Sequence, residues 1–461
     1  IILHTQAVAD YLKMEKPTNL FTRKPHKASG VFPIIRGLIG DMIGPNSPMP
    51  IMDLRNGKDE LQFLKRNDLE ELSTRGTASP DHVIRIKGRP LILKESVWSR
   101  GREAIKEELD KYAKEYKAMF ERQAPKADQP KTMLPTDPKN IWMEGIGLIG
   151  LGAKAKAASI AGDLVVQNAR VRAIGEDAGG FRPISEKDLF DCEYWSLEQA
   201  KLGKGAPPKF QGKIVMITGG SGTIGFAIAK AFSKLGAQTI LVDKDEIALK
   251  ESVAKLGVGH KYFPIDVTHS DAANQAMLAA INNFGGLDIL ISNAGAAHAG
   301  PMLGISNEEL RNAFELNFFS HYSFSTEAAK ILKDQNRGGQ ILFNISKQAV
   351  NPGKNFGAYG LPKATTFFLM RQLALELGSD GIRVNGINAD RIRSGLLTDD
   401  FISSRAKSRG VSESEYMAGN LLNKEVTAEH VADAFTALAC AESTTGHVMT
   451  VDGGNIEASL R

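Results

Sequence analysis

The sequence predicts an α/β protein: a Rossmann-type, doubly wound parallel sheet of about seven strands, preceded by a smaller mixed α/β region. Three observations predict this fold. Short apolar runs recur after residue 213, helix-like segments separate them, and a glycine-rich turn joins the first run to the first helix. Continuous apolar runs are typical of strands buried on both faces, and intervening helices are typical of parallel sheets.

The candidate strands share an apolar centre bounded by polar or turn-forming residues. They are KIVMITG (213–219), QTILVD (238–243), HKYFPID (260–266), LDILISNAG (287–295), GQILFNIS (339–346), RVNGINAD (383–390) and HVMTVDGG (447–454). The helix-like segments between them supply the crossover connections that parallel neighbours require.

A chain of 461 residues exceeds one typical hydrophobic core, so we expect two domains, 1–205 and 206–461. In the first, residues 102–123 have apolar side chains at helical spacing and predict an amphipathic helix. The proline-rich segment 124–140 is a connector and a possible subdivision. The first residue is isoleucine, so we expect a fragment, a processed form or part of something longer.

Composition argues against several classes of function. The 57 basic and 53 acidic side chains leave a net charge of only +4, so no nucleic-acid partner is expected. No apolar run reaches the ~18 residues that a membrane span needs, so no membrane partner is expected. Cys192 and Cys440 are too few for a disulfide scaffold and fit a reducing compartment, so we expect a cytoplasmic protein.

A glycine turn follows the first strand and opens a helix. Gly220, Gly222 and Gly225 satisfy the spacing G-x-G-x-x-G in that context, which favours a dinucleotide site over a merely structural turn. Glycine lets the backbone approach a pyrophosphate, and the helix N-terminus offers free N–H groups. The predicted cofactor cradle is the whole turn: Gly219, Gly220, Ser221, Gly222, Thr223, Ile224 and Gly225.

Asp243 ends the second strand, where an acid accepts hydrogen bonds from the adenine ribose. Its carboxylate would repel a 2′-phosphate, so NAD is expected in preference to NADP, although the neighbouring Lys244 relaxes that choice. The alternative is that Asp243 caps the following helix. Asp266 closes the third strand and, with Val267, is a candidate adenine contact, with helix capping again the alternative for the aspartate.

A serine, a tyrosine and a lysine follow the fifth strand. Lys363 lies four residues after Tyr359, on the same helix face, and Ser346 precedes the tyrosine by thirteen residues. Tyrosine has a pKa of about 10 and is a poor base at neutral pH, but a neighbouring ammonium favours its phenolate. The alternative to a catalytic role is that this spacing arises by chance on an ordinary amphipathic helix. With a nucleotide site in the same domain, the three residues predict proton transfer during hydride exchange.

The motifs TGGSGTIG (218–225), NAG (293–295) and YGLPK (359–363), with Asn317 and Ser346, resemble the short-chain dehydrogenase/reductase family over residues 210–461. The resemblance implies that Tyr359 is the catalytic acid or base and that Lys363 lowers its pKa and holds the nicotinamide ribose. Ser346 would position the reacting oxygen, and Asn317 would hold a water of the proton relay. Asn293, Ala294 and Gly295 would line the cofactor cleft. Family members usually form dimers or tetramers, which implies a homo-oligomer.

Three positions depart from the family pattern. Thr223 replaces the second glycine of the turn, Pro362 lies inside the helix between the tyrosine and the lysine, and Asn-Ala-Asp at 388–390 replaces Asn-Pro-Gly. Proline removes a helix hydrogen bond and is expected to bend the helix. The last two departures bear on cofactor geometry and leave the class of reaction unchanged.

The whole chain resembles a narrower group, the bifunctional rhamnulose-1-phosphate aldolase/short-chain dehydrogenases of bacterial deoxysugar catabolism. The sequence segments that show this resemblance are residues 75–92, 193–204, 352–360 and 451–461. It implies a small hydroxyaldehyde substrate such as lactaldehyde, and a zinc aldolase in the other half. No two of the nine histidines lie within four residues of each other, so we expect 1–205 to be an aldolase-like remnant without a zinc site. The lone His82 is interpreted as structural.

Residues 390–422 follow the sixth strand, where the family places a substrate-covering loop. Arg391 and Arg393 are the candidates to bind an anionic group of the substrate, whereas Arg405, Lys407 and Arg409 are interpreted as solvated surface. Both cysteines fall outside the predicted cleft segments, so an aldehyde would react as its hydrate. The alternatives are a polyol or sugar-phosphate alcohol dehydrogenase, a zinc aldolase (lyase) fragment, and a non-catalytic nucleotide-binding assembly protein.

Overall fold

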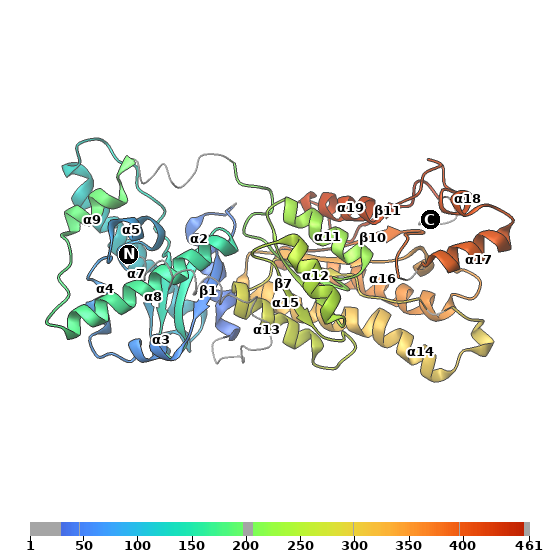
Figure 1. The fold of residues 1–461 in the computed structure, drawn as a ribbon, viewed down its shortest axis with the longest axis horizontal. Helices are drawn as coiled ribbons and strands as arrows, with labels where there is room; N and C mark the ends of the chain where they lie inside the picture. Colours follow the sequence, from blue (N-terminus) through green and yellow to red (C-terminus); the bar gives the residue numbers. More distant parts are fainter. Residues whose placement is uncertain (1–28, 46, 197–205, 298, 396, 456–461) are drawn as a thin grey trace, which may run out of the picture.

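The computed structural model describes residues 29–45, 47–196, 206–297, 299–395 and 397–455 (Figure 1). The predicted α/β class is confirmed, since a seven-stranded sheet and a four-stranded sheet are both flanked by helices. Figure 1 shows the smaller sheet with its helices at one end of an elongated molecule and the larger sheet with its helices at the other. Among the described residues, no helix combines the length and the hydropathy that a membrane span requires.

The seven-stranded sheet is parallel throughout, with the strand order β11-β10-β9-β8-β5-β6-β7. Its strands are β5 (Ile214–Thr218), β6 (Gln238–Asp243), β7 (Lys261–Pro264), β8 (Ile289–Ser292), β9 (Gly339–Asn344), β10 (Ile382–Ala389) and β11 (Val448–Val451). All seven predicted strands are present. The order reverses between β5 and β8, and the loops that leave these two strands diverge. In sheets of this type, ligands bind at that point.

Helices cover both faces of this sheet. On one face lie α11 (Thr223–Lys234), α12 (Glu246–Leu256) and α19 (Ala428–Cys440), and on the other lie α13 (Ala272–Phe284), α15 (Ser320–Gln335) and α16 (Gly357–Leu377). Alternate residues of β5 serve the two layers, because Val215 and Ile217 pack with the first group while Ile214 and Met216 pack with the second. A strand that feeds two cores must be apolar at every position, which explains its continuous apolar sequence.

Shorter elements gather beyond the carboxyl ends of these strands. They are η4 (Met302–Gly304), α14 (Asn307–Phe314), η5 (Glu315–Phe319), η6 (Lys347–Ala349), α17 (Asp399–Arg409) and α18 (Glu413–Met417). The short helix η7 (Gly378–Asp380) lies instead at the amino-terminal end of β10. Figure 1 shows α14, α17 and α18 at the end of the molecule farthest from the smaller sheet. Residues of η5, η6, α17 and α18 line the candidate site.

The four-stranded sheet has the order β1-β4-β3-β2, with β2 and β3 parallel and the other pairs antiparallel. Its strands are β1 (Ile51–Arg55), β2 (Leu91–Leu93), β3 (Asn140–Met143) and β4 (Gly147–Gly152). Helix α7 (Arg102–Gln123) coincides with the predicted amphipathic helix. The connector 124–140 leads from α7 into β3, and β3 pairs with β2, so the strands before and after this connector share one sheet.

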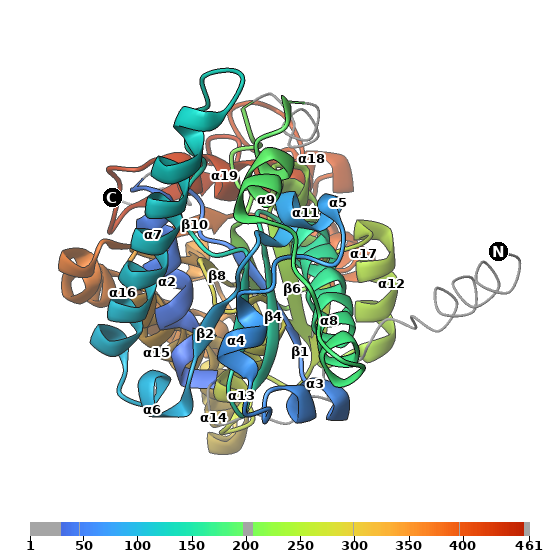
Figure 2. The ribbon, with the colours of Figure 1, turned by 90° about the vertical axis from the view of Figure 1, so that its left-hand side faces the viewer.

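The other helices of this region are η2 (Ser29–Val31), α2 (Phe32–Ile43), α3 (Lys58–Phe63), α4 (Leu69–Ser73), α5 (Pro80–Ile86), α6 (Glu95–Trp98), η3 (Ala124–Lys126), α8 (Ala155–Asp177) and α9 (Glu186–Glu193). Figure 2 looks onto this region, with α2 and α7 on one side of its strands and α8 on the other. Helix α8 packs directly on β4 and β1. A Cβ added to Gly150 would lie 2.2 Å from the Gly162 nitrogen, so this close packing requires glycine.

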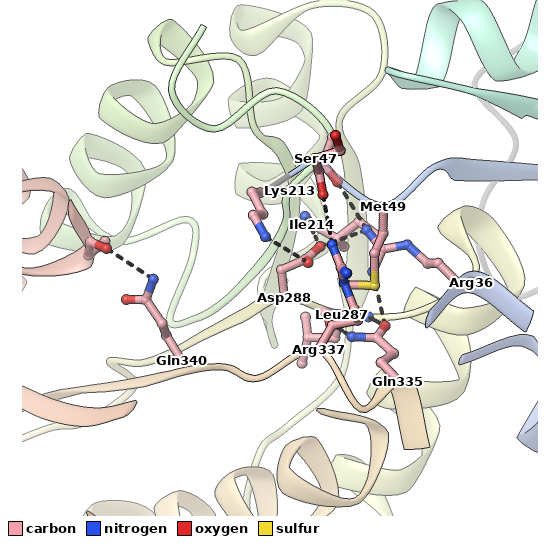
Figure 3. Close-up of polar contacts among 12 residues, drawn as sticks. Arg36, Ser47, Met49, Lys213, Ile214, Leu287, Asp288, Gln335, Arg337 and Gln340 are labelled. Carbon is pink, nitrogen blue, oxygen red and sulfur yellow. Dashed lines mark hydrogen bonds and ion pairs between the residues drawn. The ribbon is translucent and has the colours of Figure 1, made fainter. Parts of the chain in front are cut away.

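One hydrophobic cluster runs through both sheets, because α2 packs on α15 and β1 packs on α13. A buried polar network crosses the same boundary (Figure 3). The Arg36 guanidinium, with no exposed side-chain surface, pairs with the Asp288 carboxylate at 2.8 Å and donates to Gln335 Oε1 at 2.9 Å. Asp288 also accepts the Ile214 backbone N–H at 2.8 Å. The two regions are therefore joined through the amino-terminal ends of β5 and β8, opposite the candidate site.

Candidate active site

A cavity of about 1100 Å³ opens at the carboxyl ends of the large sheet. Most of the predicted site residues line it: Gly219, Gly222, Thr223, Ile224, Gly225, Asp243, Asp266, Val267, Asn293, Ala294, Gly295, Ser346, Tyr359, Lys363 and Arg391. Gly220, Ser221, Asn317 and Arg393 are predicted residues that do not line it. Segments separated by up to 197 residues in the sequence, from Gly219 to Tyr416, thus share one cavity.

The glycine turn forms a cradle between β5 and α11. Gly219 has a φ of +63°, which disfavours any residue with a Cβ. A Cβ on Gly225 would lie 2.1 Å from the Gly219 carbonyl oxygen, so the helix can approach the turn only with glycine there. Gly222 caps α11 without a side chain, which leaves the first helical N–H groups free for an anion. The shifted glycine pattern therefore fits the pyrophosphate of a dinucleotide.

Asp243 lies at the end of β6 beside this turn. Its carboxylate accepts the backbone N–H groups of Ser221 at 3.3 Å and Lys244 at 2.8 Å. The capping alternative is wrong, because the side chain that caps α12 belongs to Asp245. Ser221 therefore contacts Asp243 through its backbone N–H, although it does not line the cavity.

Asp266 also does not cap a helix. Its carboxylate accepts the backbone N–H of Thr268 at 3.0 Å and the Thr268 hydroxyl at 2.7 Å, while α13 begins after Asp271. Burial raises the pKa of Asp266, but the bonds from Thr268 and the charge of Lys244 outweigh it and hold the pKa below its ordinary value. This end of the cavity therefore carries two carboxylates and one ammonium.

The loops after β5 and β8 are tied together at the reversal of strand order. The Thr218 hydroxyl accepts the backbone N–H of Asn293 at 2.9 Å and that of Ala294 at 3.0 Å. Asn293 Nδ2 donates to the Thr218 carbonyl at 3.0 Å, and its Oδ1 accepts from Asn344 at 2.9 Å. The segment 293–295 thus fixes the width of the cleft next to the glycine turn.

Ser346, Tyr359 and Lys363 lie together on the cavity wall, with Tyr359 and Lys363 buried. Helix α16 runs unbroken through Pro362 from Gly357 to Leu377, so the tyrosine and the lysine stay on one helix. Lys363 Nζ lies 5.8 Å from the Tyr359 ring centroid and donates to the Asn344 carbonyl at 3.0 Å. Pro362 therefore leaves the tyrosine–lysine pair together.

Burial is the largest influence on the pKa of the Tyr359 phenol and on that of the Lys363 ammonium. It raises the pKa of Tyr359 to about 12, against a hydrogen bond with Ser346 that lowers it. It also lowers the pKa of the Lys363 ammonium to about 8. That Lys363 lowers the tyrosine pKa stays a prediction: its ammonium lies 5.8 Å from the Tyr359 ring centroid and donates to the Asn344 carbonyl. Further positive charge beside the phenol is needed to make it a base at neutral pH.

Asn317 lies behind this wall in η5, a π-helical turn, a local irregularity often found at functional sites. Its Nδ2 donates to the Ala296 carbonyl at 3.0 Å and to the Ala313 carbonyl at 3.1 Å, and its Oδ1 accepts the Ala296 N–H at 3.3 Å. The Thr366 hydroxyl of α16 donates to the Asn317 carbonyl at 2.7 Å. Asn317 therefore joins the 293–297 loop to the helix that carries Tyr359.

His321 is a buried neighbour that the sequence reasoning missed. Its Nε2 lies 3.5 Å from Lys363 Nζ, and its Nδ1 lies 2.6 Å from the Ser292 hydroxyl. Burial, and then the charge of Lys363, hold the pKa of the imidazole well below its ordinary value, so the ring is neutral and accepts from the lysine. The only signal in the sequence is its spacing of four from Asn317, which places both on one helical face.

The basic residues of 390–422 that line the cavity are only in part the ones that the sequence predicted. Arg393 does not line the cavity, because its guanidinium pairs with Asp399 and Glu425. Arg391 lines it, but pairs with Asp390 at 3.1 Å and donates to the carbonyls of Tyr416 and Gly419. Arg405 and Arg409, interpreted as solvated surface, line the cavity instead.

Asp390 belongs to the Asn-Ala-Asp segment (388–390) that replaces the family's Asn-Pro-Gly, and its side chain forms two ion pairs. Its carboxylate is buried and pairs with Lys347 at 3.0 Å as well as with Arg391. Lys347 follows Ser346 directly in the sequence. The Asp390 carboxylate therefore holds the Lys347 ammonium on the cavity wall next to Ser346. Neither cysteine lines the cavity, and no cluster of three or more possible metal-ligating side chains occurs among the described residues.

Two family models match the chain. Residues 26–202 match one described as aldolase class II, second domain, and residues 220–455 match one described as enoyl-(acyl carrier protein) reductase. The second match covers 236 of the 461 residues, more than half of the chain. The chain belongs to the short-chain dehydrogenase/reductase family. This confirms the resemblance read from the sequence, with an aldolase-like region in front.

One relative matches this short-chain dehydrogenase/reductase and its aldolase-like region together. It is the uncharacterized oxidoreductase YuxG of Bacillus subtilis (strain 168), which is 30% identical over 445 residues, or 92% of this chain and 63% of that protein. The chain therefore spans less than two thirds of the length of this relative.

Other relatives match the dehydrogenase half alone, among them the following two proteins. Secoisolariciresinol dehydrogenase of Forsythia intermedia is 30% identical over 257 residues, or 53% of this chain and 90% of that protein. The structure of L-sorbose reductase from Gluconobacter frateurii, complexed with NADPH and L-sorbose, is 27% identical with a TM-score of 0.50, over 54% of this chain and 98% of the reductase. A nicotinamide cofactor is therefore supported for this family member.

Proposed function

We propose that this protein is an NAD-dependent dehydrogenase that oxidises a small hydroxyaldehyde such as lactaldehyde in the breakdown of a deoxysugar. The observation that carries the chemistry is the convergence of Ser346, Tyr359 and Lys363 on one cavity with the glycine cradle. The substrate follows from the resemblance of the whole chain to the bifunctional group. Neither Cys192 nor Cys440 forms a disulfide within the described part of the chain, which supports a cytoplasmic setting.

In this proposal the dinucleotide, held by the glycine turn and Asp243, supplies the hydride acceptor. Tyr359 takes the proton of the reacting hydroxyl, and Ser346 holds the oxygen by its hydrogen bond. Lys363 binds the nicotinamide ribose and passes protons toward the interior, with Asn317 ordering a water. Gly220, Ile224, Val267 and the 293–295 segment complete the cofactor site.

Asp243 sets the cofactor preference in this proposal. Replacing Asp243→Asn keeps an acceptor for the Ser221 N–H but removes the charge that repels a 2′-phosphate. We expect the ratio of NADP to NAD affinity to rise by about 10- to 100-fold, measured by titration of both dinucleotides. Asp245→Asn is the matched control, because asparagine caps α12 equally well and the ratio should stay as in the parent. An unchanged ratio in Asp243→Asn would exclude this role.

An aldehyde has to react as its hydrate, because neither Cys192 nor Cys440 lines the cavity. The geminal diol then loses a hydride from carbon and a proton from one hydroxyl to Tyr359, and a carboxylic acid results. We expect the double variant Cys192→Ala/Cys440→Ala to keep the turnover of the parent, measured as NADH formation. A large loss of turnover in a folded double variant would instead favour a covalent thiohemiacetal.

A second candidate substrate class is a polyol or a sugar phosphate. Two observations favour it: the basic side chains in the cavity wall and the L-sorbose complex of the Gluconobacter frateurii reductase. The catalytic residues would be the same. The proposal also includes assembly into a dimer or tetramer, which exposed apolar side chains on α15 and α16 support, among them Tyr322, Phe368 and Leu375.

The test is reduction of NAD and NADP by the purified chain with lactaldehyde, polyols and sugar phosphates. NADH formation from any of these substrates supports the proposed chemistry, and the preferred substrate assigns the class. Binding of NAD without turnover on any substrate would favour the alternative of a nucleotide-binding assembly protein.

A further inference from the structure

We propose that the half of the cavity around α17 is a phosphate site, and that the substrate is a phosphorylated hydroxy compound. This inference rests on the proposed function, because it takes Tyr359 as the group that meets the reacting end of the substrate. Of the two candidate substrate classes, it selects the second, and within that class the sugar phosphates.

The charges of the cavity wall are strongly unequal. Seven lining residues are basic, namely Lys244, Lys347, Lys354, Lys363, Arg391, Arg405 and Arg409, and three are acidic, namely Asp243, Asp266 and Asp390. Two of the acids and Lys244 lie at the β6–β7 end, where the adenosine is expected. The excess of positive charge therefore lies in the other half, near Tyr359. An anionic group on the substrate would pair with this excess.

Several of these cations already have partners. Lys347 and Arg391 share the carboxylate of Asp390, and Lys363 donates to the Asn344 carbonyl. Arg405 differs: its Nε is buried and has no hydrogen-bond partner within the described part of the chain. Buried polar groups are nearly always bonded, so an orphaned guanidinium N–H on a cavity wall points to an absent acceptor.

Aromatic rings hold Arg405 in place without using its donors. Its guanidinium carbon lies 5.4 Å from the Phe356 ring centroid and 5.7 Å from that of Phe401. The two rings meet edge to face, with centroids 6.1 Å apart. Contacts to ring faces fix the plane of a guanidinium and leave the N–H groups in that plane available. Arg405 is therefore positioned in advance for an oxyanion.

The same aromatic contact places Arg405 close to the reacting group. The carbonyl of Phe356 accepts the backbone N–H of Tyr359 at 3.1 Å, so the ring under Arg405 belongs to the first turn of α16. Arg409 follows one helical turn later on α17 and lies over the Tyr416 ring at 5.3 Å. Two guanidinium groups on one helix face match the charge and the several acceptor oxygens of a phosphate dianion.

The first experiment measures binding of inorganic phosphate to the NAD-loaded full chain by calorimetry, with acetate as the carboxylate comparison. We expect phosphate to bind more tightly than acetate, and Arg405→Gln to weaken phosphate binding by about 10- to 100-fold. Lys407→Gln, on the same helix but outside the cavity wall, is the matched control and should bind as the parent. Arg409→Gln, which leaves the Phe356 and Phe401 contacts intact, repeats the test if Arg405→Gln does not fold.

The second experiment separates this inference from the proposed function. Turnover is compared between a phosphorylated hydroxy compound and its unphosphorylated analogue, and Arg405→Gln should raise KM for the phosphorylated compound alone. If the parent binds NAD and turns over the neutral compound, but phosphate binding is absent, weaker than that of acetate, or equal in Arg405→Gln, the phosphate site is overturned and the dehydrogenase stands. If Tyr359→Phe keeps full turnover, the proposed function fails, whatever the calorimetry shows.

Discussion

Tyr359→Phe is expected to lower turnover by about 10²- to 10⁴-fold, the usual contribution of a positioned proton-transfer group. The phenol is buried, hydrogen-bonded to Ser346 and next to the lysine on α16. Phenylalanine keeps the ring and removes only the hydroxyl that is proposed to exchange the proton. The affinity for NAD should stay close to that of the parent, since the glycine cradle and Asp243 are untouched. Steady-state turnover and NAD titration on the same preparation check both statements.

The exposed Tyr322→Phe on α15 is the control for this change and should turn over as the parent. The pH dependence gives a second check. Because burial raises the pKa of Tyr359 to about 12, the fraction in the basic phenolate form increases as pH rises toward that value. Alcohol oxidation should therefore accelerate with pH in the parent. The residual rate of Tyr359→Phe should lack this rise, and a shared pH profile would assign the base to another group.

Arg36→Met is expected to destabilise the whole chain by about 3–5 kcal/mol, the usual cost of removing one partner of a buried ion pair. Both side chains are almost fully buried, so the carboxylate of Asp288 would be left unpaired in an apolar boundary. Lys213, at 3.5 Å, cannot replace the lost bond because the geometry of its ammonium is poorer. Denaturant unfolding monitored by circular dichroism measures the change.

Two further variants make this test specific. Lys209→Met removes an exposed ion pair with Glu442 and should leave the midpoint unchanged. Arg36→Met/Asp288→Asn removes both charges and keeps an acceptor for the Ile214 N–H, so it should regain part of the lost stability. If the double variant is no more stable than Arg36→Met, loss of packing and not the unpaired charge explains the effect.

The same pair gives a pH dependence of stability with a definite sign. Burial alone would raise the pKa of Asp288, but the Arg36 and Lys213 charges and the hydrogen bonds outweigh it and lower the pKa. A carboxyl whose pKa is lower in the folded protein stabilises above its unfolded pKa, about 3.9, and loses that contribution as pH falls through the folded value. The parent should therefore lose stability more steeply in acid than Arg36→Met/Asp288→Asn.

The sheet and the cofactor cradle could be predicted because their signals are local. A strand buried on both faces must be apolar along its whole length, so β5 to β10 stand out in the sequence. The turn at Gly219–Gly225 needs glycine where φ is positive and where the helix approaches the strand. Tyr359 and Lys363 are four residues apart on one helix, so their proximity requires nothing beyond helical geometry.

The roles of charged side chains could not be predicted in the same way. Arg393 and Arg405 look alike in the sequence, and only the packing of α17 against Phe356 directs Arg405 into the cavity while Asp399 and Glu425 hold Arg393 outside. His321 is likewise an unremarkable helical histidine until Ser292 and Lys363 meet it from other elements.

The α/β class, the strands of the large sheet, the glycine turn and the tyrosine–lysine pair all follow from local patterns in the sequence. Only tertiary packing determines which arginines line the cavity, which cations pair with Asp390, and how the aldolase-like region is held by Arg36 and Asp288 across 252 residues. The physical reason is the range of the interaction. Periodic burial and backbone conformation restrict which residue types can occur at each position, so they can be recognised in the sequence. The partner of a charged side chain depends instead on which distant segments the packed core brings beside it.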